Sequence, residues 1–570
     1  MDSEDSDGSN ISGAVYDEGD PWGNYDEGDF GGVVVNELDI DNELAIYDIR
    51  NNILNDRDRD DIRAFYLRIK SNMSRFNFDL MRRSFSHKME INSLYTITRR
   101  MAVLSDVNVT QYDCCINSCL AYTGKHTELD ECPYCHEPRL DKDHQPRRQF
   151  MYIPLFPRLA AFFQSPDMIN KLSYRANFQH TVGQIHDVFS GENYQAMKSR
   201  RVVVDGEILP HKFFSDERDI AFGLCTDGFL LFGRKRGGPS ATPLLVKNYN
   251  LAPHIRTHLE NLICVGVIPG PKQPKDLTSF LTPFDDECAS MAKGISCFDS
   301  MSCQVFTLHA YQLFQEGDII AIEKFLGIKG HSSSCPCHSC IMKGVQMASG
   351  ANKVFYIPLQ HPIPLDPDSP QMIWDPTALP SRTHDSFANN LKLIGDAKRI
   401  TKKYGKQMEQ FYGNKEMPAL SRVNSLDFGR SLPWEWMHLF AENIIPNMMD
   451  LWTGRFKGLD EGTEHYGISM DIWEEIGIET AASTINIPSA FVRFMGNVAE
   501  SRATFTAESY AFWFMYLAPY LLAGRLADPY YQHFLGLVAI MKITLQFEFT
   551  VEQIDQLETR IIQWVSDYER

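Results

Sequence analysis

Short apolar runs separated by turns, in the middle of the chain, constrain the fold more than any other feature. Three of these runs predict consecutive strands, namely Ile220–Cys225, Thr242–Tyr249 and Leu262–Ile268. A helical pattern over Leu277–Gly294 follows, and Cys303–Phe314 predicts a fourth strand that runs into Asp318. This order of elements indicates an α/β domain built on a mixed sheet.

Acidic residues stand at the ends of the first and fourth predicted strands. Three strands, a helix and a fourth strand form the opening of an RNase H-like fold with a mixed five-stranded sheet, in which the first and fourth strands are neighbours. We therefore expect Asp227 and Asp318 to face one another. Two such carboxylates repel unless divalent cations lie between them, so the pattern predicts a pair of Mg²⁺ or Mn²⁺ ions roughly 4 Å apart. Asp227-Gly228 is also a common turn dipeptide, and turn formation is the alternative interpretation.

Glu508 is the candidate for a third carboxylate of this site. It follows Thr506 at the start of a predicted helix, and this arrangement is equally typical of a helix cap.

The length of 570 residues predicts two to four structural units. Charge is distributed unevenly along the chain. Residues 1–60 hold 18 acids and 3 arginines, a charge of 3 − 18 = −15, which leaves −19 + 15 = −4 for the remainder. Residues 1–40 repeat Tyr-Asp-Glu-Gly-Asp, at Tyr16–Asp20 and Tyr25–Asp29, and predict a disordered acidic tail. An alternative interpretation is a mimic of DNA that competes for a basic surface.

Residues 41–111 predict a basic helical region. From Asp61 to Arg100 the chain has nine Lys or Arg against three acids. A nucleic-acid contact and an ordinary pair of amphipathic helices are both compatible with this pattern.

Met1 is followed by acids rather than by a leader, and apolar runs such as Phe512–Leu522 are too short for a bilayer. We therefore expect a soluble intracellular protein with no membrane partner.

Cysteines gather in two clusters. In residues 112–140, Cys115-x3-Cys119 precedes Cys132-x2-Cys135, and two such pairs joined by a turn supply four thiolates for a structural zinc ion. Cys114 is an alternative to Cys115. The second cluster holds Cys335, Cys337 and Cys340.

The remaining chain divides by pattern. We expect a connecting region at 141–205, the catalytic core at 206–380, a large helical insertion at 381–500, and C-terminal helices with the third acid at 501–570. The predicted helices are Asp385–Tyr412, Trp434–Trp452, Ser489–Met495, Ala507–Leu522 and Val551–Tyr568.

Motifs spread over residues 110–570 resemble those of CACTA (En/Spm-type) transposases, particularly fungal ones. They are Tyr112–Arg139, Thr226–Phe229, Tyr249–Leu251, Val267–Lys272, Gly317-Asp318, Cys335–Cys340 and Trp436–Leu439. The resemblance implies an RNase H-like domain that cuts and joins DNA at terminal inverted repeats.

By position, the resemblance makes Asp227 the first catalytic acid, Asp318 the second and Glu508 the third, with Glu435, Glu442 and Glu474 as rivals for the third place. It also implies a second zinc site from Cys337, Cys340 and His438, with Cys335 as a possible fourth ligand. Glu435-x2-His438 fits a family pattern of an acid or Cys, two spacers and a His.

The implied function is DDE-type transposition, with DNA as partner, a homo-oligomer on paired ends and location in the nucleus. Arg234–Arg236 is the one short basic run, and it either contributes to nuclear localisation or contacts phosphate. The alternative is a domesticated or inactive derivative that binds DNA or protein without catalysis.

Overall fold

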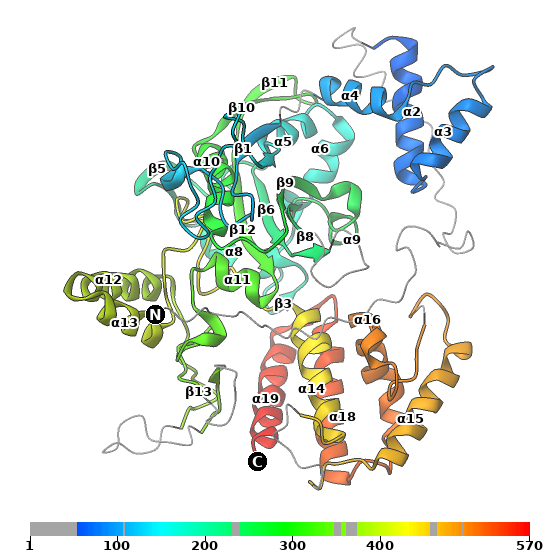
Figure 1. Ribbon diagram of the computed structural model, residues 1–570, viewed down its shortest axis with the longest axis vertical. Coiled ribbons are helices and arrows are strands. Elements are labelled where there is room, and N and C mark those ends of the chain that lie inside the picture. The colour runs from blue at the N-terminus through cyan, green and yellow to red at the C-terminus, as the bar shows by residue number, and fades with distance from the viewer. Residues whose placement is uncertain are drawn as a thin grey trace.

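The computed structural model describes residues 54–105, 109–230, 240–346, 355–360, 373–456, 464–492 and 494–570. The predicted acidic tail and Arg234–Arg236 lie outside these residues. An α/β core, a small group of N-terminal helices beside it and a helical body below it make up the molecule (Figure 1).

The N-terminal group has three helices, α2 (Asp56–Lys70), α3 (Arg75–Ser84) and α4 (Leu94–Leu104). Asn55 caps α2 in a capping box with Asp58, which satisfies two backbone N–H groups of the first turn. Phe78 from α3 and Ile97 from α4 are fully buried in the small core. The basic helical region that the sequence predicts is helical over these described residues.

The main sheet has seven strands, where the sequence predicts five. Its order is β1-β2-β9-β8-β6-β12, and β7 pairs with β8. The bounds are β1 Thr110–Asp113, β2 Gln149–Tyr152, β6 Ile220–Thr226, β7 Phe229–Leu230, β8 Ser240–Asn248, β9 Ile263–Pro269 and β12 Ala310–Gly317. β12 is parallel to β6 and the other pairs are antiparallel. The first and fourth predicted strands are therefore neighbours, as expected.

The predicted fourth strand, Cys303–Phe314, is two strands. β11 (Gln304–Leu308) pairs back onto β10 (Ile295–Asp299), and β12 begins two residues later. The break lies at His309, whose carbonyl accepts from Ile220 N–H at 2.9 Å and whose Nδ1 lies 3.1 Å from Asp219 Oδ1. These two contacts place Ala310 level with Ile220, so that β12 runs beside β6.

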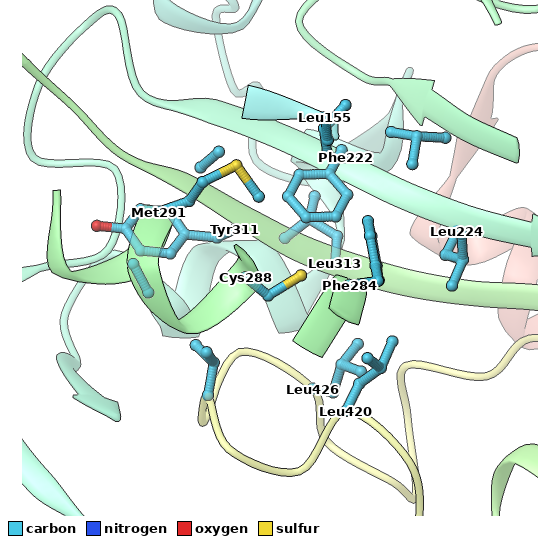
Figure 2. Packing of buried hydrophobic residues seen from close by; sticks show 14 of the residues in the cluster. Leu155, Phe222, Leu224, Phe284, Cys288, Met291, Tyr311, Leu313, Leu420 and Leu426 are labelled. Carbon is cyan, nitrogen blue, oxygen red and sulfur yellow. The ribbon is translucent and has the colours of Figure 1, made fainter. Parts of the chain in front are cut away.

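Helix α10 (Leu277–Lys293) covers one face of the sheet. Phe284, Cys288 and Met291 of α10 point toward Phe222 and Tyr311 of β6 and β12, and Leu420 and Leu426 close the same core from a later loop (Figure 2). This core extends from Cys114 to Leu432, so the sheet is rigidly supported at the strand ends that carry the predicted acids.

Shorter elements surround this core. The helices are α5 (Phe156–Phe162), α6 (Pro166–Leu172), α7 (Tyr174–Asn177), α8 (Glu192–Met197), α9 (Pro253–Arg256) and α11 (Ile319–Phe325). The two-stranded pairs are β4 (Arg201–Val204) with β5 (Glu207–Lys212), β13 (Val345–Gln346) with β14 (Phe355–Tyr356), and β3 (Gln184–Ile185) with β15 (Phe549–Thr550).

The last part of the chain is helical. α12 (His384–Ile400) and α13 (Lys402–Tyr412) form a pair, and a second core gathers the helical body from Phe440 to Met541 across the predicted boundary at residue 500. Its α-helices are α14 (Ile445–Trp452), α15 (Met470–Ser483), α16 (Ala507–Phe512), α17 (Ala518–Leu521) and α18 (Asp528–Thr544), and α19 (Val551–Tyr568) packs on α18. Two segments, Met437–Ile444 and Trp513–Leu517, have the wider turn of a π-helix.

The predicted helix Ser489–Met495 is wrong where it is described. Phe491 N–H donates to Pro488 O at 3.0 Å in a turn, and Thr484 Oγ1 donates to Met495 O at 2.7 Å. Pro488 and these two bonds favour a closed loop over a helix. Among the described residues, no helix has both the length and the apolar character needed to cross a bilayer.

Candidate active site and metal centre

Asp227 and Asp318 follow two paired strand ends. Thr226 of β6 is in register with Gly317 of β12, and each acid is the next residue along a parallel pair. The rigid sheet thus places the two carboxylates at the same edge. Asp318 also caps α11, because its Oδ1 accepts from Ala321 N–H at 2.6 Å.

Asp227 is an exposed residue on which several other charged groups act. The pKa of Asp227 is raised, first by the protein atoms that surround the carboxylate and second by the negative charge of Asp318. The Gly228 N–H, which donates to Asp227 Oδ1 at 2.7 Å, and the charge of His438 oppose the rise, whereas Glu435 adds to it. Asp318, Glu435 and His438 are therefore all close enough to act on Asp227.

Gly317 allows the turn from β12 into α11. A Cβ at this position would lie 2.9 Å from Thr226 O and 3.0 Å from Ala321 Cβ. Because Thr226 O belongs to the neighbouring strand end, any side chain here would push the two acids apart. Gly228 is less constrained, since its Cβ would make ordinary contacts with Gln273 and Thr242.

Lys324 is a residue of this region that the sequence did not single out. Its Nζ donates to Gln273 Oε1 at 2.6 Å. Burial lowers the pKa of Lys324, and the charges of Asp318 and Glu323 oppose that effect. In the sequence, Lys324 is only a lysine six residues after Asp318. Such a spacing is too common to indicate a site residue.

The helical body brings a further acid and a histidine to the sheet edge. Glu435 Oε2 accepts from His438 N–H and lies 2.6 Å from His438 Nδ1, and His438 Nε2 lies 3.7 Å from Glu442. The wide turn from Met437 to Ile444 begins at this pair. Glu435 and His438 therefore form a hydrogen-bonded unit, and the charges of both act on Asp227.

Glu508 lies on a neighbouring helix. It is an exposed residue in the first turn of α16, and α16 packs against the segment that carries His438 and Glu442. Thr506 caps α16 by accepting from Ser509 N–H at 3.2 Å. The charge of Glu435 acts on Asp227. The rival Glu474 lies on exposed surface of α15.

Cys337 and Cys340 lie close together, but His438 does not join them in this structure. The interaction with the Cys340 thiol lowers the pKa of Cys337 to about 6. Arg382 holds the loop by donating to the carbonyls of Cys335 and Cys337 at 3.0 and 2.9 Å. Within the described ranges, the ligand atoms of Cys337, Cys340 and His438 form no metal-binding group of three. The second zinc site thus stays a prediction.

The first cysteine cluster does form a metal-binding group. The Sγ atoms of Cys115, Cys119, Cys132 and Cys135 all lie within 4.8 Å of one another. A tetrahedral zinc ion with Zn–S bonds of about 2.3 Å requires S–S separations of about 3.8 Å, so the four thiols fit zinc. Cys114 lies outside the group and packs in the main core instead.

Local backbone geometry explains why these spacings work. Ser118 N–H donates to Cys115 O at 2.7 Å and His136 N–H donates to Cys132 O at 2.8 Å, so each cysteine pair forms a tight turn. Ser118 and His136 adopt positive φ angles of 57° and 58° to close these turns. Asn117 donates its backbone N–H to Cys115 Sγ at 3.4 Å and its amide to Cys135 Sγ at 3.6 Å, and these two bonds join the two cysteine pairs.

The cysteine module is attached to the core by Asp276. This carboxylate is 2 % exposed, caps α10 by accepting from Ser279 N–H at 3.1 Å, and lies 2.8 Å from His126 Nε2 of the module. Cys119 O also accepts from the N–H groups of Lys275 and Asp276 at 3.0 and 2.9 Å. β1 and β2, which flank the module, extend the main sheet, so the module is an insertion into a hairpin of the core.

Comparison of the chain with models of known protein families finds one match. A model described as "Transposase family tnp2" matches residues 204–368, which is less than a third of the chain. The match supports a transposase family. It runs from the end of β4 past Asp227 and Asp318 to beyond Cys340, and it leaves out the first cysteine module and the helical body. None of the curated proteins matches the chain.

Proposed function

We propose that this chain is a DDE-type transposase, which cleaves DNA at terminal inverted repeats and joins it to target DNA. The observation that carries the proposal is the position of Asp227 and Asp318 at adjacent ends of the parallel pair β6 and β12. The tnp2 family match over the same residues supports it. The CACTA subtype and its fungal affiliation rest on the sequence motifs.

An RNase H-like assignment of the core is supported by its topology. Three antiparallel strands, β6, β8 and β9, precede α10, and β12 returns parallel to β6 at the edge of the three. The strand ends are held by the large core, so the two acids keep their separation without support from loops.

Asp227 and Asp318 would hold the divalent metal pair together with a third acid, although among the described residues they and Glu435 form no group of three ligand atoms within 4.8 Å. Asp318 raises the pKa of Asp227, and a bound cation would remove this repulsion. Two Mg²⁺ or Mn²⁺ ions bound there would activate a water or 3′-hydroxyl and stabilise the leaving oxygen of an in-line displacement. Two of the chain's own residues would position the reaction: Gly317 keeps the strand ends close, and the Lys324 amine interacts with the charge of Asp318.

We infer that the third acid is either Glu435, which directly precedes the helical turn that starts at Trp436, or Glu508 in the first turn of α16. Glu435 acts on Asp227 directly, and its bond to His438 fixes its orientation. Glu508 remains the predicted residue by family position. We favour Glu435, because its charge acts on Asp227 and its bond to His438 holds it in one orientation.

Other parts of the proposal follow from the function. Zinc bound by Cys115, Cys119, Cys132 and Cys135 stabilises the module and takes no part in catalysis. DNA as partner, a homo-oligomer on paired ends and location in the nucleus are proposed on the family resemblance.

Cleavage of a supercoiled plasmid that carries the repeat ends flanking the coding region tests the proposal. With Mg²⁺ or Mn²⁺, Asp227→Asn and Asp318→Asn are each expected to lower nicking at least about 100-fold, since each removes a metal ligand. Asp471→Asn changes an exposed acid of α15 and is the matched control. DNA binding, measured in parallel, should survive all three substitutions.

Comparison of Glu435→Gln with Glu508→Gln in the same assay identifies the third acid. A loss confined to Glu508→Gln would show that our preference for Glu435 is wrong. If the unsubstituted chain binds the repeat ends but never nicks them, the non-catalytic alternative replaces the enzyme.

A further inference from the structure

Helix α3 exposes an apolar face that no described residue covers. Phe76 is 75 % exposed and Leu80 is 54 % exposed, and with Arg83 they recur at the i, i+4, i+7 spacing that aligns side chains along one face of a helix. Phe78, on the opposite face, is fully buried in the small core. The small core therefore uses only one side of α3. The aromatic and aliphatic side chains on the other side remain available for a further contact.

The helix is fixed in place with this face outward. Ser74 caps it by accepting from Asn77 N–H at 3.1 Å, and Asp61 accepts from Asn92 N–H at 2.8 Å in the linker that follows α3. Basic residues surround the apolar pair: over Ser74–Met89 there are four Lys or Arg and one acid, Asp79. The face thus combines positive charge with exposed apolar surface.

One segment of the same chain has the complementary chemistry. Tyr16–Phe30 contains six Asp or Glu, no Lys or Arg, and the aromatic residues Tyr16, Trp22, Tyr25 and Phe30. Its two Tyr-Asp-Glu-Gly-Asp repeats alternate aromatic with acidic residues. An aromatic segment without acids would fit the apolar pair alone, and an acidic one without aromatics would fit the basic residues alone. This segment fits both.

We propose that the acidic–aromatic segment Tyr16–Phe30 docks on the Phe76–Leu80–Arg83 face of α3. The 23 residues from Gly31 to Ile53 join the segment to the start of the helical group, and they can span up to about 75 Å when extended. Helix α2, which separates this point from α3, is about 22 Å long at 1.5 Å per residue. The segment can therefore reach any part of α3, at an effective concentration in the millimolar range.

The docked segment would keep the basic group from binding nucleic acid until DNA displaces it. A phosphate backbone complements the arginines but offers no partner for Phe76 and Leu80, whereas the segment offers carboxylates and aromatic rings together. This role of the segment in blocking nucleic-acid binding rests on the proposed transposase function. The contact between Tyr16–Phe30 and α3 does not depend on that function.

A binding measurement on the full chain tests the contact. A fluorescent peptide of residues 14–32 is titrated with the unsubstituted chain and with a variant in which the six acids of Tyr16–Phe30 are changed to Asn or Gln. If the segment occupies α3 in cis, the peptide binds the neutralised variant about 10-fold more tightly, because a site of about 0.1 mM affinity is mostly filled at millimolar effective concentration.

Substitutions on α3 locate the site. Phe76→Ser with Leu80→Ser, made in the neutralised chain, should weaken peptide binding at least about 10-fold. The matched control is Ile485→Ser with Phe494→Ser, which removes side chains that are 88 % and 66 % exposed elsewhere. Circular dichroism checks that both double variants keep their helix content.

Equal peptide affinity for the neutralised and unsubstituted chains overturns the proposal, and so does an α3 variant that binds the peptide normally. If the α3 variant loses affinity for duplex DNA and not for the peptide, the face is a DNA surface and the proposal is wrong. Peptide affinity is independent of DNA cleavage, so an inactive enzyme leaves this result interpretable.

Discussion

Asp276 joins the cysteine module to the core, and its substitution should separate two roles that the carboxylate combines. It caps α10 through Ser279 N–H at 3.1 Å and accepts from His126 of the module at 2.8 Å. Loss of a helix cap costs about 1 kcal/mol, and a buried ring N–H left without an acceptor costs about 1–3 kcal/mol. Asp276→Ala should therefore lower the free energy of unfolding by about 2–4 kcal/mol.

Two comparisons separate these contributions. Asp276→Asn keeps a good capping residue and loses the acceptor for His126, so it should cost about 1–3 kcal/mol. Thr383→Ala removes the cap of α12, a helix of the same 17 residues, without touching the module, and should cost about 1 kcal/mol.

The effect should also depend on pH. Burial alone would raise the pKa of Asp276, but the bond with His126 and the charge of Lys125 together hold it below its ordinary value. A lowered pKa in the folded state stabilises the protein above about pH 4 and loses this contribution as the pH falls further. The unsubstituted chain should thus lose more stability than Asp276→Asn on acidification below about pH 4.

Urea unfolding gives the free energies, and hydrogen–deuterium exchange reports the module and the first turn of α10 separately. Faster exchange in residues 112–140 is expected for both Asp276 variants and not for Thr383→Ala. If Asp276→Ala costs no more than Thr383→Ala and leaves exchange in the module unchanged, Asp276 does not join the two parts.

Three further predictions concern other parts of the chain. Cys132→Ser should reduce the zinc content, measured by atomic emission on purified protein, by one ion per chain; unchanged zinc would exclude the four-cysteine site. Arg256→Leu removes the two hydrogen bonds of 2.9 and 2.7 Å that Arg256 donates to the buried carboxylate of Asp187 and leaves those from the Tyr174 hydroxyl and Val188 N–H. It should cost about 3–5 kcal/mol in urea unfolding, whereas a cost below about 1 kcal/mol would show that the pair is replaceable. Gly317→Ala should lower metal-dependent nicking more than it lowers the melting temperature, and equal activity would show that the strand ends tolerate a Cβ.

The sequence predicts the core well because its signal is local. The strands at 220, 242 and 262 and the helix at 277 begin within two residues of the expected positions, since apolar runs and turn residues mark their ends. The cysteine group is also predictable, because ligand spacing alone restricts its geometry. Cys115 rather than Cys114 enters the group, a choice that depends on which side chain faces the main core.

Long-range pairing is what the sequence does not determine. Nothing local to β1 and β2 indicates that they extend the sheet beyond β9, and nothing local to His309 indicates that its bond with Asp219 ends one strand and begins another. The interaction of Glu435 with Asp227 is likewise a long-range feature that local sequence does not determine. It depends on how the helical body packs on the sheet edge across more than 200 residues of chain.

The wide turn from Met437 to Ile444 changes the direction of Glu442, one of the rivals for the third acid. A π-turn amounts to one residue inserted into a regular helix, and each residue of an α-helix advances the side-chain direction by about 100°. Acids beyond such a turn therefore point elsewhere than a 3.6-residue repeat implies. Within this helical stretch, which ends at Trp452, gain or loss of a single residue would redirect the side chains that follow it, Glu442 among them, relative to Glu435 and His438.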